Sequence, residues 1–259
     1  MRLKGKVAII TGSSRGIGRC IAETFASEGA HVVINGKKTS QRQLEVLAQE
    51  IGNDTIKTLA VKGDVGEAKT VQRLMEQTLD KFGTVDILVN NAGVSPMASI
   101  EQITEEQWDE VFTINLKSAF LCSKAVFPRM KKQHSGVILN ISSGSAKSGG
   151  IGAHYAASKA AMNTFTKSLA FEGALHGIRA NSICPGPIET NMSQSLFSEE
   201  RKRFLESVIP LGRLGTPQDI AHAAVFLCSG EASYISGEIL DLDGGLIFLK
   251  PLSYPTKLK

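Results

Sequence analysis

Short apolar runs alternate with segments of helical periodicity along this chain, and the alternation strongly constrains how it can fold. Seven runs have the length of a strand and are rich in Val, Ile and Leu: KVAII, HVVI, IKTLAV, DILV, GVILNI, IRANSI and EILDLD. Strands that are apolar on both faces are typical of a parallel sheet covered by helices on both sides. The order therefore predicts an α/β fold with a doubly wound sheet of seven mainly parallel strands.

The segments between these runs place apolar residues at helical spacing, and several, such as TVQRLMEQTLDKFG, close on a glycine suited to a helix C-terminus. No internal repeat, low-complexity tract or linker divides the 259 residues, so we expect one domain over 1–259. The least regular region is 185–217, where a proline-rich turn leads into a short amphipathic stretch. We expect a substrate lid at about 187–216.

Composition describes a globular protein, with 42% hydrophobic and 21% charged residues and a net charge of +4. The basic residues are dispersed, and pairs such as Lys37 with Lys38 are too short to form a nucleic-acid stripe. No apolar run approaches the roughly 18 residues that span a bilayer. The N-terminus lacks a signal-peptide cleavage site, and the four cysteines lack metal-ligand spacing. We expect a cytoplasmic protein that binds no nucleic acid, membrane or metal.

The first apolar run leads into the glycine-rich segment TGSSRGIG, from Thr11 to Gly18, and then into a helical pattern. Residues without Cβ let the backbone approach a pyrophosphate, and a helix N-terminus offers N–H groups and positive potential to phosphates. The spacing is G-x-x-x-G-x-G, whereas the general dinucleotide fingerprint is G-x-G-x-x-G. The segment predicts nucleotide binding, with an ordinary tight turn between strand and helix as the alternative.

The second strand ends in HVVINGKKTS, which holds no carboxylate to bind the adenosine ribose of NAD. It offers Lys37 and Lys38 instead, and Arg15 lies in the glycine-rich segment within reach of the same ribose. Cations attract a 2′-phosphate, so the sequence favours NADP over NAD. The alternative is that the two lysines only solvate a loop.

Tyr155 and Lys159 stand four residues apart in a small-residue stretch, AHYAASKAAMN, and so share one face of the expected helix. A nearby ammonium favours a phenolate and lowers the tyrosine pKa, which suits acid–base chemistry. With only this motif as evidence, a Tyr–Lys contact exposed on a packed helix explains the spacing equally well.

Two further polar residues occupy informative places. Ser142 follows the fifth strand, at the edge where open α/β sheets bind ligands, and its hydroxyl can bond a carbonyl oxygen. Asn115, in FTINLKSAF, lies among apolar residues of an expected helix. An amide that interrupts helix bonding can hold a water of a proton relay, and the alternative is a satisfied structural amide.

Taken in order, these motifs resemble the short-chain dehydrogenase/reductase family, in its single-domain form, over essentially the whole chain. The Rossmann-type fold of that family agrees with the predicted sheet. Within it, the chain is most similar to reductases of 3-oxoacyl thioesters of acyl carrier protein, through the stretch GRLGTPQDIAHAAVFLCSGEASYISGEILDLDGG. The matching motifs are TGxxxGIG at 11–18, Asp64 with Val65, NNAG at 90–93, Asn115, Ser142, YxxxK at 155–159, and Pro185 with Gly186.

The resemblance implies that Tyr155 is the general acid, that Ser142 orients the carbonyl, and that Lys159 lowers the tyrosine pKa and binds the nicotinamide ribose. Asn115 completes a water-linked proton relay. The alternative roles are a helix N-cap for Asp64 and a loop cap for Thr190. The implied cofactor-binding residues are Gly12, Ser14, Arg15, Gly16, Ile17, Gly18, Lys37, Lys38, Asp64, Val65, Asn91, Ala92, Gly93, Tyr155, Lys159, Pro185, Gly186, Ile188 and Thr190.

The resemblance further implies reversible, NADPH-dependent reduction of a ketone or aldehyde, and a homotetramer that packs through its long helices. One departure weakens a carrier-protein substrate, because the arginines that dock the acidic carrier correspond to Gln133 and His176 here. A sugar, a polyol or another small ketone is the alternative substrate, and an idle NADP-binding regulator is the alternative class. Candidate pocket residues are Ser95, Met97, Ser143, Gly149, Met192 and Phe197.

Overall fold

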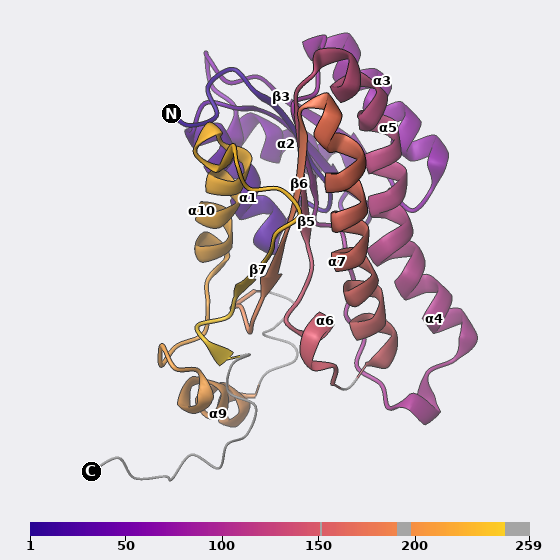
Figure 1. The fold of residues 1–259 in the computed structure, drawn as a ribbon, viewed down its shortest axis with the longest axis vertical. Helices are drawn as coiled ribbons and strands as arrows, with labels where there is room; N and C mark the ends of the chain where they lie inside the picture. Colours follow the sequence, from indigo (N-terminus) through magenta and orange to yellow (C-terminus); the bar gives the residue numbers. More distant parts are fainter. Residues whose placement is uncertain (151, 191–197, 247–259) are drawn as a thin grey trace.

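The computed structural model describes residues 1–150, 152–190 and 198–246. Seven strands form one sheet in the order β3-β2-β1-β4-β5-β6-β7, and every neighbouring pair is parallel (Figure 1). The doubly wound sheet predicted from the sequence is therefore confirmed. The strands are β1 (Val7–Ile10), β2 (His31–Gly36), β3 (Thr58–Lys62), β4 (Ile87–Asn90), β5 (Gly136–Ile141), β6 (Ile178–Pro185) and β7 (Ile239–Leu242).

Helices connect successive strands, and their ends carry the expected capping signals. Ser40 and Gln43 form a capping box before α2, and Gly83 ends α3 in the left-handed conformation at a φ of 71°. The α-helices are α1 (Gly16–Ser27), α2 (Gln41–Ile51), α3 (Ala68–Phe82), α4 (Glu105–Phe112), α5 (Ser118–Gln133), α6 (Ser145–Ser148), α7 (Ala153–Gly173), α9 (Glu199–Val208) and α10 (Pro217–Cys228). Shorter turns are η1 (Ile100–Gln102), η2 (Thr113–Lys117), η3 (Ala174–His176) and η4 (Gly230–Ala232).

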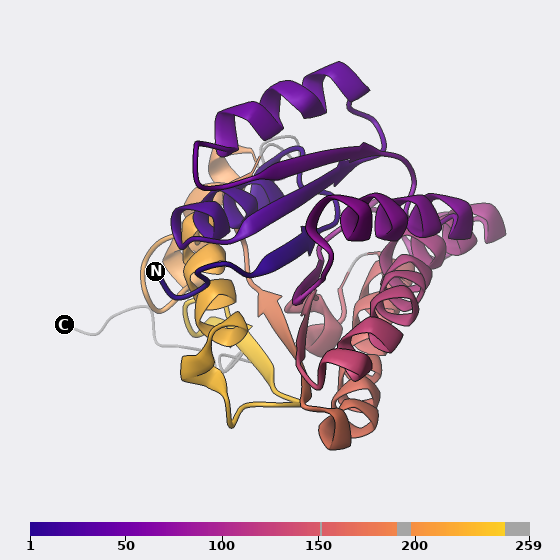
Figure 2. The same cartoon turned by 90° about the horizontal axis from the view of Figure 1, so that it is seen from above.

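Two helical layers enclose the sheet. α1, α2 and α10 cover one face, and α3, α5 and α7 cover the other (Figures 1 and 2). Alternate residues of one strand enter opposite cores: Ile10 packs with the first layer, and its neighbour Ile9 packs with the second. This two-residue period explains why the strands read as continuous apolar runs.

The winding reverses beside β1, which pairs with β2 on one side and with β4 on the other. The chain leaves β1 toward one side of the sheet and leaves β4 toward the other. The two connections separate at this point and leave a crevice at the carboxyl ends of the strands. The turn after β1 lies at that crevice, as do the ends of β4 and β5.

The segment after β6 leaves the sheet and returns to its starting point. Ile188 forms a parallel bridge with Gly215, and the Glu189 N–H donates to the Gly215 carbonyl at 2.9 Å. Within this excursion α9 has no buried residue and lies beyond the carboxyl end of the sheet (Figure 1). The predicted lid at 187–216 includes residues 191–197, which lie outside the described residues, so the lid stays a prediction.

Candidate active site

A cleft of about 630 Å³ opens at the carboxyl ends of the strands. Every residue that the resemblance assigns to the cofactor lines it, from the glycine-rich turn after β1 to Thr190 after β6. None of the described residues forms a cluster suited to a metal ion. The further lining residues are Asn35, Gly36, Thr39, Gln43, Gly63, Val94, Ser95, Glu110, Ile114, Ile141, Ser142, Ser143 and Pro187.

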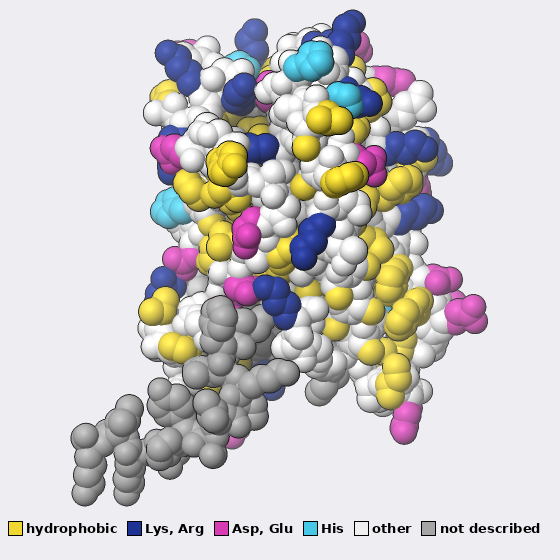
Figure 3. All heavy atoms as spheres, viewed as in Figure 1, with side chains coloured by type: hydrophobic (Ala, Val, Ile, Leu, Met, Phe, Trp, Pro, Cys, Tyr) yellow, Lys and Arg dark blue, Asp and Glu magenta, His cyan; other side chains and the backbone are white. Residues whose placement is uncertain are grey.

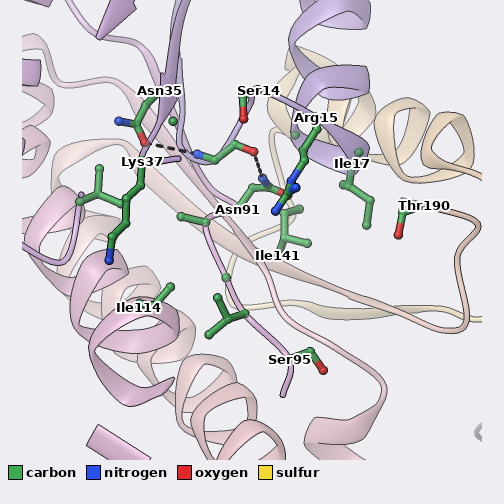
Figure 4. Close-up of a pocket in the computed structure, with 18 of the residues that line it drawn as sticks. Ser14, Arg15, Ile17, Asn35, Lys37, Asn91, Ser95, Ile114, Ile141 and Thr190 are labelled. Carbon is green, nitrogen blue, oxygen red and sulfur yellow. Dashed lines mark hydrogen bonds between the residues drawn. The ribbon is translucent and has the colours of Figure 1, made fainter. Parts of the chain in front are cut away.

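Close backbone packing explains two glycines of the turn after β1. Gly12 has a φ of +63°, and a Cβ there would lie 2.8 Å from the Cα of Ala92. A Cβ on Gly18 would lie 2.6 Å from the Gly12 carbonyl oxygen. The Asn91 side chain, at the end of β4, donates to that same oxygen at 3.1 Å (Figure 4). The turn is therefore fixed against β4 at the point where a pyrophosphate would approach.

The N-terminus of α1 is open to an anion. Its N-cap residue is Arg15, which makes no side-chain capping bond, and the first turn contains no acidic residue. The first N–H groups of a helix have no partner within the helix, and the helix dipole adds positive potential there. A glycine-rich turn packed against β4 and an uncapped helix N-terminus together fit the pyrophosphate of a dinucleotide.

Cations surround the position expected for the adenosine ribose. Arg15, Lys37 and Lys38 all line the cleft, and the Arg15 side chain extends toward Asn91 in Figure 4. Lys37 Nζ lies 2.7 Å from Asp64 Oδ2, and this hydrogen-bonded pair raises the pKa of Lys37. Burial raises the pKa of Asp64, but hydrogen bonds from Lys37 and Gly66 outweigh it and leave that pKa below its ordinary value.

Tyr155 lines the cleft from the first turn of α7. Burial raises its pKa, and hydrogen bonds with Ser143 and Ser95 lower it by less, so the phenol stays above its ordinary pKa. Lys159 is not among the groups that shift this pKa, and its predicted effect on the phenol stays a prediction. The phenol is therefore protonated at neutral pH and can donate to an oxygen.

The serine beside Tyr155 is not the one predicted from the sequence. The Ser142 hydroxyl donates to the main-chain oxygen of Lys159 at 3.0 Å, and Ser142 is only 4% exposed. Ser143, the next residue, hydrogen-bonds with the phenol. Consecutive residues leaving a strand point to opposite sides, and the loop decides which one faces the ligand. Both serines line the cleft, and in this structure Ser143 rather than Ser142 contacts the phenol; which of them orients a carbonyl stays a prediction.

Lys159 lies one turn beyond Tyr155, on the same helix. Its Nζ donates to the Ile141 carbonyl at 2.8 Å and lies 5.9 Å from the centre of the Tyr155 ring. Burial lowers the pKa of this ammonium to about 8. The hydrogen bond to Ile141 places the ammonium at the end of β5, where Lys159 lines the cleft.

Asn115 lies in η2, a π-helical turn between α4 and α5, within the region where the sequence predicted a helix. Its side chain is fully buried and accepts from the Val94 N–H at 2.8 Å. It also donates to the Val94 carbonyl at 3.0 Å and to Ser158 Oγ at 3.1 Å. The side chain joins the segment after β4 to α7 and does not line the cleft. A water relay through this position stays a prediction.

The candidate pocket residues divide into three groups. Ser95 and Ser143 line the cleft, whereas Met97 and Gly149 are absent from its walls. Met192 and Phe197 lie outside the described residues. The sequence missed Glu110 and Ile114, which reach the cleft from α4 and the π-helical turn. The position of Ile114 next to Asn115 was the only available signal, and nothing in the sequence distinguished Glu110 from its exposed neighbours.

Comparison with known proteins places these features in context. Residues 12–247 match the family model described as enoyl-(acyl carrier protein) reductase. The 3-oxoacyl-[acyl-carrier-protein] reductase FabG of Vibrio cholerae is 42% identical over 250 residues, which cover 96% of this chain and 100% of that protein. FabG of Escherichia coli is 42% identical over 248 residues, which cover 95% of this chain and 99% of that protein.

A solved structure is similar over nearly the same length. It is a 7α-hydroxysteroid dehydrogenase in complex with NADH and 7-oxo glycochenodeoxycholic acid, with a TM-score of 0.90 and 38% sequence identity. The match covers 94% of this chain and 95% of that chain. Proteins with different substrates thus share this fold, and the substrate must be argued from the site.

Proposed function

The chain belongs to the short-chain dehydrogenase/reductase family and is an oxidoreductase that uses a nicotinamide cofactor, and from this premise we propose that it reduces a ketone or aldehyde to an alcohol with NADPH. The observation that carries this proposal is the meeting of Tyr155, Ser143 and Lys159 at one cleft. A protonated phenol, a neighbouring hydroxyl and a buried ammonium are the groups that carbonyl reduction requires.

NADP is the proposed form of the cofactor. No carboxylate follows β2, and Gly36, Lys37 and Lys38 line the cleft there, with Arg15 opposite. A 2′-phosphate would be attracted by these cations. The ion pair with Asp64 holds Lys37 at this position and partly offsets its charge. Arg15 and Lys38 would therefore share the phosphate with it.

The nicotinamide cofactor supplies a hydride to the carbonyl carbon. Tyr155 donates the phenolic proton to the carbonyl oxygen, and Ser143 donates a hydrogen bond to the same oxygen as charge develops on it. Lys159, one helical turn away, would stabilise the phenolate that remains after proton transfer and would hold the nicotinamide ribose. Asn115 holds the segment after β4 against α7, so that both walls of the cleft keep their spacing.

A 3-oxoacyl thioester is the proposed substrate class, on the strength of relatives that match end to end. At one position where the resemblance implies an arginine that docks the carrier protein, this chain has Gln133. Gln133 accepts from Arg129 Nε at 2.7 Å and donates to the Val85 carbonyl at 3.1 Å, and so is held within the protein. The absence of an arginine at this position weakens the case for an acidic carrier protein as the carrier of the thioester.

We also propose a cytoplasmic homotetramer. Among the described residues, none of the helices is both long enough and apolar enough for a bilayer. Apolar side chains gather over α4, α5 and α7 in Figure 3. Phe171 on α7 and Leu175 on η3 are both more than four-fifths exposed, and Phe120 on α5 is 44% exposed. Burying such a face between copies of the chain removes apolar surface from water.

The experiment is NADPH oxidation against a panel of carbonyl compounds: a 3-oxoacyl group on acyl carrier protein, on coenzyme A and on a short thiol, together with sugars, small ketones and an oxo bile acid. The proposal predicts the highest kcat/KM for a 3-oxoacyl thioester. A higher value for a sugar or a steroid would replace the substrate class. Tight NADPH binding without turnover of any compound would favour the idle regulator.

A further inference from the structure

A short helix, α6 (Ser145–Ser148), lies in the chain between Ser143 and Tyr155, the two residues proposed to contact the carbonyl oxygen. It begins two residues after Ser143 and ends seven residues before Tyr155. On its C-terminal side, Gly149, Gly150 and Gly152 all have positive φ, between 69° and 125°. Glycines restrain the backbone least of all residues, so the connection to α7 contributes little to holding α6 in place.

The first two residues of α6 donate hydrogen bonds to Ser143, one of them to its hydroxyl oxygen. The Ser145 N–H donates to Ser143 Oγ at 3.2 Å, and the Ala146 N–H donates to the Ser143 carbonyl at 3.0 Å. A hydroxyl has one proton to donate and accepts through its lone pairs. With Ser145 bonded to its oxygen, the Ser143 hydroxyl can direct its proton toward Tyr155 or a substrate. The orientation of this hydroxyl thus depends on the position of α6.

An ion pair anchors α6 to the far edge of the sheet. Lys147 Nζ lies 2.6 Å from Asp241 Oδ2 on β7, and the side chains are 38% and 16% exposed. The other oxygen, Asp241 Oδ1, is buried and has no hydrogen-bond partner in the described part of the chain. A largely buried carboxylate without its cation is costly, so the pair has a strong preference for the observed geometry.

We propose that the ion pair of Lys147 with Asp241 positions α6, and through it the Ser143 hydroxyl, for proton donation by Tyr155. This inference rests on the proposed function, because it assigns a role in the same reaction. Neither residue lines the cleft, so both act through Ser143 and are positioning residues.

The test uses four variants of the full chain: K147M, K147R, D241N and the double variant K147M/D241N. K6M is the matched control, since Lys6 lies 3.7 Å from Asp86 with exposures of 48% and 17%, at the opposite end of the strands. For each protein, kcat, the Kd of NADPH, the melting temperature and amide hydrogen exchange are measured.

We expect K147M to lower kcat by about tenfold or more, since small misplacements of a reacting group have effects of this size. The Kd of NADPH should change less than about twofold, and K147R should retain most of the turnover because Arg keeps the pair. K147M alone leaves the Asp241 carboxylate without its cation, and the double variant removes that charge as well. The melting temperature of the double variant should therefore return toward the wild-type value, while kcat stays low. K6M should leave kcat unchanged.

A purely structural role predicts a different result, in which the double variant regains both the melting temperature and kcat, and this result would overturn the inference. An unchanged kcat in K147M would overturn it as well. Hydrogen exchange separates these outcomes from failure of the proposed function. If the wild type reduces no carbonyl, the proposed function fails, and faster exchange of the Ala146 to Gly149 amides in K147M would still establish the anchoring of α6.

Discussion

The Ser142 hydroxyl donates to the main-chain oxygen of Lys159 at 3.0 Å, and this bond holds Ser142 away from the phenol of Tyr155. Ser142 directly follows β5 and Lys159 lies on α7, so the bond ties the helix that carries Tyr155 to the end of that strand. We therefore expect a structural role for Ser142 and propose that its neighbour Ser143 contacts the carbonyl oxygen.

Alanine substitutions should separate these two serines. S143A removes a donor to the developing oxyanion and should lower kcat by about 100-fold. S142A removes one buried hydrogen bond and should lower the free energy of unfolding by about 1 kcal/mol, with a much smaller effect on kcat. Steady-state kinetics and urea denaturation of both variants check this. A loss of kcat in S142A that exceeds the loss in S143A would reverse the assignment.

Y155F should lower turnover by about 100-fold or more, because the ring is kept and the proton donor is lost. The Kd of NADPH, measured by titration of its fluorescence, should stay nearly unchanged. Y234F is a suitable control, since Tyr234 is fully exposed and lines no part of the cleft. Normal turnover in Y155F would remove Tyr155 from the mechanism.

Lys159 should make stability depend on pH. Its pKa is about 8 in the folded protein against 10.5 as the ordinary value, so folding disfavours the charged form. Below pH 8 the ammonium is charged in both states and its burial lowers stability, on the order of a few kcal/mol. Between pH 8 and 10.5 the folded state releases its proton first, and this cost is relieved.

K159M, which carries no charge, should therefore gain most over the wild type near pH 7, and its advantage should shrink as the pH rises to 10. Melting temperatures of both proteins at several pH values measure the difference. K69M provides the control, because the Lys69 side chain is 84% exposed and its removal should give a nearly constant difference. A constant difference for K159M as well would contradict the lowered pKa of Lys159.

K37A should lower kcat/KM with NADPH by about tenfold, since a cation at a phosphate contributes roughly one charge-assisted hydrogen bond. The value with NADH should fall less, because that cofactor lacks the 2′-phosphate. The ratio of the two efficiencies is the measurement. An equal loss with both cofactors would mean that Lys37 serves only to neutralise Asp64, its partner at 2.7 Å.

Local sequence patterns were sufficient to predict most of the fold. The strand ending at Ile10, the glycines at 12, 16 and 18, and the pairing of Tyr155 with Lys159 on one helix face all follow from sequence spacing. These features depend on contacts between residues close in the chain or on apolar periodicity, and both are written directly in the sequence. The cleft residues named from family motifs were predicted through the resemblance, and the order of the strands in the sheet brings them together.

By itself, then, the sequence determined the seven parallel strands, the crevice at their carboxyl ends and the residue types that line it. Only the tertiary structure decided which serine faces Tyr155, that Asn115 lies in a π-helical turn bonded to Val94, and that Lys147 reaches Asp241. Each of these depends on the direction of a side chain after a strand or helix ends, and that direction is set by contacts with residues far away in the chain.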